Sequence, residues 1–86
     1  MRIVGYIPNR YCKITVFEYK GGFSVKCETP MCEQFYKLNE DDLIEHFDDV
    51  NQIFNKEFID EIVQRMQQMQ STLINNYKRF EKSKSS

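Results

Sequence analysis

The spacing of hydrophobic residues along the chain changes near Asn39. Before it, apolar residues recur at every second position, as in a strand with one buried face. After it, they recur at every third or fourth position, as in an amphipathic helix. Strands followed by helices predict an α+β domain: an antiparallel meander of three or four strands, then a short acidic helix and a long C-terminal amphipathic helix packed on one face.

The clearest part of the predicted sheet is a hairpin around Gly21-Gly22. Lys13 to Tyr19 is rich in β-branched and aromatic residues, and Phe23 to Thr29 alternates between apolar and polar residues. Two glycines readily adopt the positive φ angles of a two-residue turn. The predicted opposing pairs are Val16 with Cys27 and Ile14 with Thr29.

This turn separates the side chains of the hairpin into two faces. The predicted core face carries Ile14, Val16, Phe23, Val25 and Cys27. The predicted outer face carries Thr15, Phe17, Tyr19, Ser24, Lys26 and Glu28. A three-residue loop is the alternative, and it would group Phe17 and Tyr19 with Phe23 and Val25, because a slip of one residue moves a strand's side chains to the opposite face.

A further strand is predicted after the break at Pro30-Met31, over Cys32 to Leu38. A four-residue loop over 28–31 is preferred, with Cys27 opposite Cys32 and Lys26 opposite Glu33. The shorter loop would place Glu28 opposite Glu33, and like charges in that position are destabilising. Both loops place Tyr36 and Leu38 on the core side, with Phe35 and Lys37 on the outer side. Whether Arg2 to Ile7 adds another strand stays open.

Two helices are predicted after the sheet. Asn39 is a suitable N-cap, Glu40, Asp41 and Asp42 fill a first turn, and Leu43, Ile44 and Phe47 form an apolar face over 40–47. Low helix propensity predicts an interruption within Asp48 to Asn55. Asn55 then caps a second helix over about 56–81; one unbroken helix over 40–82 is the alternative. The whole is one domain over residues 1–82, with a frayed tail at 83–86.

The second helix is longer than the sheet that it covers. Its apolar stripe consists of Phe58, Ile62, Met66, Met69, Leu73, Tyr77 and Phe80. The helix would measure roughly 39 Å and a seven-residue strand only about 23 Å. Leu73, Ile74, Tyr77 and Phe80 should therefore extend past the sheet, which favours a homodimer that buries them. The alternative is a monomer in which the short helix or the N-terminal segment folds over them.

The outer sheet face is a second candidate surface. Phe17, Tyr19 and Phe35 lie there among Lys26 and Lys37, and a cluster of exposed aromatics is typical of an interaction surface. Aromatic rings beside lysines can stack the bases of single-stranded nucleic acid. Charge argues against a strong phosphate-binding surface: residues 39–61 carry one Lys and nine Asp/Glu, and the sequence pI is about 5.8.

Catalytic and metal-binding chemistry has little support in the sequence. Cys12, Cys27, Cys32 and His46 are the only candidates for a zinc site, and their spacing lacks the close pairs of typical sites. His46 is the only histidine, and no phosphate-binding glycine loop is present. The expectation is a non-catalytic interaction or assembly domain with no cofactor, metal or small-molecule substrate.

The expected location of the chain is the cytoplasm, without membrane association. The apolar residues before Pro8 are too few for a signal peptide, and no apolar run approaches the ~20 residues of a membrane span. Three cysteines, an odd number, are typical of reduced thiols.

Overall fold

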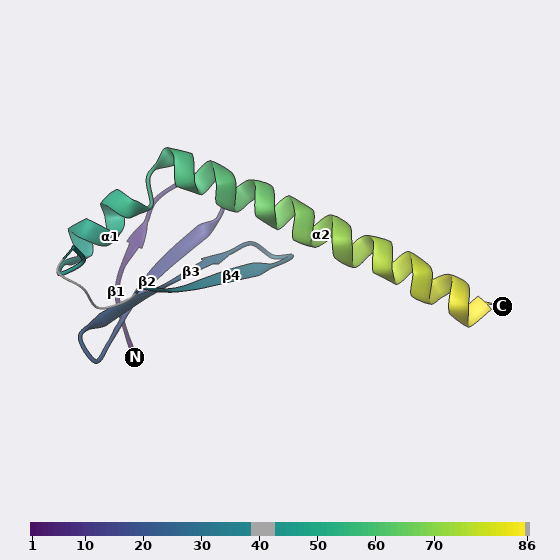
Figure 1. Ribbon diagram of the computed structural model, residues 1–86, viewed down its shortest axis with the longest axis horizontal. Coiled ribbons are helices and arrows are strands. Elements are labelled where there is room, and N and C mark those ends of the chain that lie inside the picture. The colour runs from purple at the N-terminus through teal and green to yellow at the C-terminus, as the bar shows by residue number, and fades with distance from the viewer. Residues whose placement is uncertain (39–42, 86) are drawn as a thin grey trace.

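The computed structural model describes residues 1–38 and 43–85. Their strands and helices are β1 (Arg2–Ile7), β2 (Lys13–Tyr19), β3 (Gly22–Glu28), β4 (Glu33–Leu38), α1 (Phe47–Ile53) and α2 (Lys56–Ser85). The strands form one antiparallel sheet in the order β1-β2-β3-β4, and both helices lie over the same face of it (Figure 1). The predicted α+β meander is confirmed, and β1 joins the sheet as its fourth strand.

The hairpin between β2 and β3 turns one residue earlier than predicted. Its turn is Lys20-Gly21, with φ angles of 53° and 82°, rather than Gly21-Gly22. Ile14 is therefore paired with Cys27, and Val16 with Val25, so the predicted pairs were wrong by two residues. The observed register places the fully buried Val16 and Val25 directly opposite each other. The predicted faces are nevertheless correct, because a shift of two residues keeps each side chain on its side.

The hairpin between β3 and β4 has the register that appeared unfavourable because it places two glutamates opposite each other. Glu28 is paired with Glu33, so the predicted pairing of Cys27 with Cys32 was wrong. Thr29 explains the shorter loop: its N–H donates to the Cys32 carbonyl at 2.9 Å, and its Oγ1 accepts from the backbone N–H groups of Met31 and Cys32. These local hydrogen bonds outweigh the repulsion of two carboxylates at the edge of the sheet.

Two features of the register affect the outer face. Lys26 Nζ lies 3.6 Å from Glu28 Oε1, which offsets part of the like-charge contact. Phe35 pairs with Lys26, and Lys37 pairs with Ser24, so the predicted outer-side positions of Phe35 and Lys37 are confirmed.

The short helix lies further along the chain than predicted. Asn39 to Asp42 fall outside the described residues, and the segment 43–46 is not helical. α1 begins only at Phe47, because the Asp49 carboxylate accepts the backbone N–H groups of Glu45 and His46 at 2.9 and 3.0 Å and closes the N-terminus there. Leu43 is largely exposed, so the predicted apolar face of a helix over 40–47 does not form.

The break between the helices falls at Phe54 and Asn55, within the predicted interval. Asn55 caps α2 as expected, with its Oδ1 accepting the Phe58 N–H at 3.0 Å. The two-helix prediction is confirmed, and α2 continues to Ser85, beyond the predicted 81.

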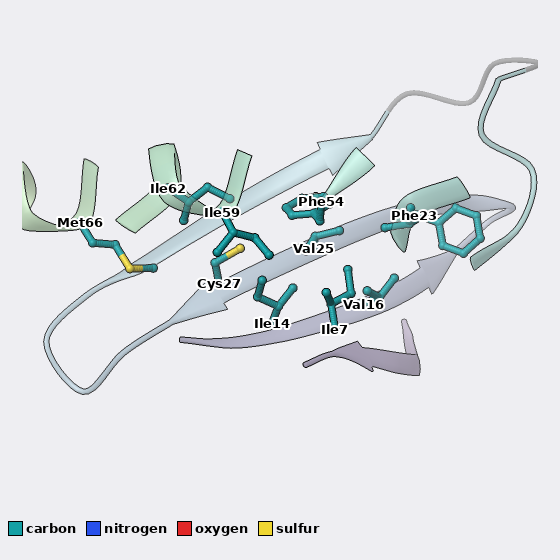
Figure 2. Packing of buried hydrophobic residues seen from close by; sticks show 11 residues of the cluster. Ile7, Ile14, Val16, Phe23, Val25, Cys27, Phe54, Ile59, Ile62 and Met66 are labelled. Atoms are coloured by element: carbon teal, nitrogen blue, oxygen red, sulfur yellow. The ribbon is translucent and has the colours of Figure 1, made fainter. Parts of the chain in front are cut away.

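The hydrophobic core lies between the sheet and the helices (Figure 2). Its buried members are Ile7, Ile14, Val16, Phe23, Val25, Cys27, Val50, Phe54, Ile59, Ile62 and Met66. Gln34 on β4 attaches the sheet to α2, donating from Nε2 to the Ile62 carbonyl at 2.8 Å. Met66 is the last buried residue of α2, so the core covers only the first part of that helix.

Candidate interaction surfaces

The C-terminal part of α2 extends beyond the end of the sheet (Figure 1). At 30 residues, α2 is about 45 Å long. The tip of the β3–β4 hairpin reaches only the level of Met66, where Cys32 Sγ lies 3.8 Å from the Met66 carbonyl oxygen. The molecule consequently measures 56 Å along its longest axis and 26 and 19 Å along the others.

Apolar side chains beyond Met66 are exposed to solvent. The α2 overhang, as we call this surface, consists of Met69, Leu73, Ile74, Tyr77 and Phe80. The exposed fractions of the four residues predicted to extend past the sheet are 51% for Leu73, 43% for Ile74, 64% for Tyr77 and 56% for Phe80. Within the described residues, neither the N-terminal strand nor α1 folds over them, so the monomer alternative offered by the sequence is not the observed arrangement.

A groove of about 830 Å³ runs between the β3–β4 loop and the α2 overhang. Met31 and Cys32 line it on the loop side, and Leu73 and Tyr77 line it on the helix side. Glu33, Arg65 and Arg79 add charged residues to its lining. The groove therefore combines apolar and charged residues, as protein-binding surfaces do.

The helix around this groove is unusually poor in charge. From Met66 to Tyr77 the sequence contains no Asp, Glu, Lys or Arg. The polar positions of this stretch are Gln, Ser, Thr and Asn, although most of them are exposed. Depletion of charged residues is typical of the centre of a protein interface, not of a helix face meant only for solvent.

The outer face of the sheet carries a second cluster, the aromatic–lysine face. Phe17 and Phe35 are stacked, with ring centroids 6.5 Å apart, and Lys26 Nζ lies 6.0 Å from the Phe17 centroid. Tyr19 carries Lys20 over its ring at 5.4 Å. Lys37 lies on the same side two residues beyond Phe35. All five residues predicted for this face are thus on one side of the sheet.

Tyr6 belongs to the same face and was not identified from the sequence. It pairs with Thr15 across β1 and β2, is exposed, and has Lys13 Nζ 5.7 Å from its ring centroid. Tyr6 directly precedes the buried Ile7, so the alternation of side chains along a strand would have placed it outward, but only once β1 was known to pair with β2. Both helices lie on the other side of the sheet, so no described element covers this face.

The three cysteines do not form a metal site. In the described part of the chain, no group of three or more His, Cys, Asp or Glu side chains is placed to hold a metal ion. Burial, with a smaller contribution from the nearby Cys12, raises the pKa of the Cys27 thiol to about 12. Burial also raises the pKa of Cys12, although its hydrogen bond to Asn9 acts in the opposite direction. Cys27 is therefore a small core residue and a poor metal ligand.

His46 has a structural environment with no catalytic geometry. Its side chain is exposed, with Nε2 4.0 Å from Glu45 Oε2, and its backbone N–H belongs to the Asp49 cap of α1. The pKa of Asp49 is lowered mainly by the hydrogen bonds from Glu45 and His46. The Asp49 carboxylate thus serves the start of α1.

Comparison with known protein families, with curated proteins and with solved structures finds no match for this chain. None of the described helices is long and apolar enough to cross a membrane. Function must therefore be argued from the two surfaces themselves.

Proposed function

We propose that this chain is a non-catalytic assembly domain that forms a homodimer through the α2 overhang. The observation that carries the proposal is the exposure of Leu73, Ile74 and Tyr77 on a length of helix without charged residues, and of Phe80 on the same stripe just beyond it. Fully burying a large apolar side chain contributes on the order of 1.5–3 kcal/mol. Four half-exposed side chains in each of two copies leave enough unburied apolar area to drive a micromolar dimer.

A second copy of the chain can cover the α2 overhang without any other molecule. A two-fold axis brings the same surface of each copy together, so one apolar stripe is sufficient for both sides of the contact. The four- and three-residue steps of the stripe suit helix-on-helix packing at a small crossing angle. No cofactor, metal or small-molecule substrate enters this proposal.

Analytical ultracentrifugation or light scattering at tens of micromolar tests the proposal. The expected mass is about twice that of the 10.4 kDa chain. Leu73→Glu combined with Phe80→Glu should give a monomer with an unchanged helical circular dichroism signal from the folded core. The matched control is Ser71→Glu combined with Asn75→Glu, which adds the same charge to the opposite side of α2. A monomeric parent protein would overturn the proposal.

A second candidate function is weak binding of single-stranded nucleic acid by the aromatic–lysine face. It is favoured by one specific observation: three aromatic rings of this face, those of Tyr6, Phe17 and Tyr19, each have a lysine Nζ within 6.0 Å of the centroid. Exposed rings can stack on bases while the lysines contact phosphates. Glu28 and Glu33 also lie on this face, which limits the expected affinity.

Titration of a labelled single-stranded RNA at low salt tests this second function. Binding should weaken steeply as salt is added, and Phe17→Ala with Phe35→Ala should abolish it. Tyr77→Ala is the matched control, because it removes an aromatic ring that lies on α2. Absence of binding at low salt, or equal binding by all variants, would exclude the aromatic–lysine face as the site.

A further inference from the structure

We infer that the two copies pack antiparallel, with Tyr77 near the two-fold axis and Lys84 of each copy facing Glu33 of the other. This inference rests on the proposed self-association and adds its orientation and register. Three observations carry it: the length of the uncovered helix, the position of the β3–β4 hairpin tip, and two opposite charges that form no salt bridge with any described residue.

The uncovered length determines where the axis lies. α2 is uncovered from Met69 to Ser85, a length of about 25 Å, and Tyr77 is its midpoint. An antiparallel copy centred on Tyr77 covers the whole segment and is itself covered. Leu73 then lies opposite the Phe80 region of the other copy. A parallel copy would instead bring the two sheets to the same end of the helix pair, where both need the same space.

The position of the hairpin tip determines where the end of each helix lies in the antiparallel arrangement. Because Cys32 lies beside Met66, the tip of the β3–β4 hairpin marks the point where the groove begins. With Tyr77 at the axis, residue 84 of the second copy lies opposite Gln70, one turn beyond that point. The end of each helix thus reaches the hairpin of the other copy without overlapping its sheet.

Charge complementarity supports this register. Lys84 continues the apolar stripe, four residues after Phe80, and its Nζ lies 5.5 Å from the Phe80 ring centroid. The other basic residues near this end, Lys78, Arg79 and Lys82, lie on different sides of the helix. Lys84 is therefore the basic residue in line with the stripe, whereas Arg79 lines the groove from another side of the helix.

Glu33 supplies the opposite charge, because it lies on the outer side of β4 at the tip of the β3–β4 hairpin and also lines the groove there. It is paired with Glu28, whose carboxylate already has Lys26 beside it. Among residues 1–38 and 43–85, neither Glu33 nor Lys84 takes part in a salt bridge, although Arg65 and Arg79 also line the groove. The antiparallel dimer places Lys84 next to Glu33, whose carboxylate forms no salt bridge among the described residues.

Charge reversal tests the contact. Two such contacts form in each dimer, so Glu33→Lys or Lys84→Glu alone should raise the dimer dissociation constant about three- to tenfold. The double variant restores opposite charges and should return the constant to within about twofold of the parent value. Lys82→Glu is the matched control, because it makes the same change on the opposite side of the helix and should leave the constant unchanged.

Disulfide trapping tests the orientation independently of charge. In a Cys12→Ser, Cys32→Ser background, Leu73→Cys mixed with Phe80→Cys should give a crosslinked heterodimer under mild oxidation, and neither variant alone should crosslink efficiently. In a parallel pair, each variant alone would crosslink efficiently, and the mixture would not favour the heterodimer.

The possible outcomes distinguish failure of the proposed arrangement from failure of self-association. A dimeric parent in which both single reversals are neutral, or in which the double variant is the weakest, overturns the Glu33–Lys84 contact while self-association stands. Self-crosslinking of Leu73→Cys overturns the antiparallel orientation. A monomeric parent overturns self-association and this arrangement together.

Discussion

Gly5 on β1 lies directly against the ring of Phe47, the first residue of α1. A Cβ atom added at Gly5 would be 2.6 Å from Phe47 Cε2 and 2.8 Å from Phe47 Cζ, closer than real contacts allow. The same glycine follows an irregularity in the β1–β2 register, between Ile3 and Gly5. The absence of a side chain at Gly5 is what allows α1 to approach the edge of the sheet.

Gly5→Ala should therefore lower the free energy of unfolding by about 1–3 kcal/mol, because the Phe47 ring has to move away from β1. Urea denaturation followed by circular dichroism measures the change. Gly22→Ala is the matched control, because it makes the same substitution on β3, which is not adjacent to β1 in the sheet, and the expected change is less than about 0.5 kcal/mol. In a Phe47→Ala background the cost of Gly5→Ala should largely disappear; an unchanged cost would place its origin elsewhere.

The β2–β3 turn offers a stabilising substitution. Lys20 has a φ angle of 53°, in the left-handed region that Asn adopts more readily than Lys, and Gly21 follows with 82°. Lys20→Asn should raise the free energy of unfolding by about 0.5 kcal/mol, even though the contact between Lys20 and Tyr19 is lost. Thermal unfolding provides the measurement. Gly22→Asn, just outside the turn, should not stabilise; if it did so equally, the turn would not be Lys20-Gly21.

Acid should remove the contribution of Asp49 to stability. Its folded-state pKa is lowered by the backbone hydrogen bonds at the start of α1, so its contribution is complete above the unfolded value of about 3.9. That contribution is lost as the pH falls through the lowered folded pKa. The difference in stability between the parent and Asp49→Asn should therefore be present at neutral pH and shrink in strong acid. Asp48→Asn, with no backbone bond of this kind, is the control; a pH-independent difference for Asp49→Asn would contradict the cap.

Thiol labelling should distinguish the three cysteines. Cys27 is fully buried and its pKa is about 12, so almost no thiolate is present near pH 8. We expect Cys27 in the folded protein to be labelled at least about a hundredfold more slowly than in urea, as mass spectrometry of the labelled peptides can show. Rapid labelling of Cys27 without denaturant would mean that the sheet opens readily.

Patterns with a fixed period were sufficient for much of the fold. Alternation separated Val16 and Val25 from Phe17 and Lys26, and that division survived a wrong turn position because a shift of two residues preserves the side. The stripe through Leu73 and the cap at Asn55 were also readable, since both depend on residues close together in the sequence.

Strand registers and helix starts that depend on which of several competing contacts is stronger could not be predicted from residue spacing. The Glu28–Glu33 pairing looked unfavourable because the hydrogen bonds of Thr29 could not be weighed against it. The outward position of Tyr6 required the pairing of β1 with β2, and the start of α1 depended on which acidic residue turned back to cap it.

The sequence by itself determined that strands precede helices, the two faces of the β2–β3 hairpin and the excess length of the final helix, because each follows from residue spacing and the rise per residue. Only the tertiary structure decided the strand registers, the close approach of Phe47 to Gly5 and the point, at Met66, where the core ends. Those features depend on which side chains meet across the sheet. The spacing of residues along one chain does not specify such meetings, since several registers satisfy the same periodicity.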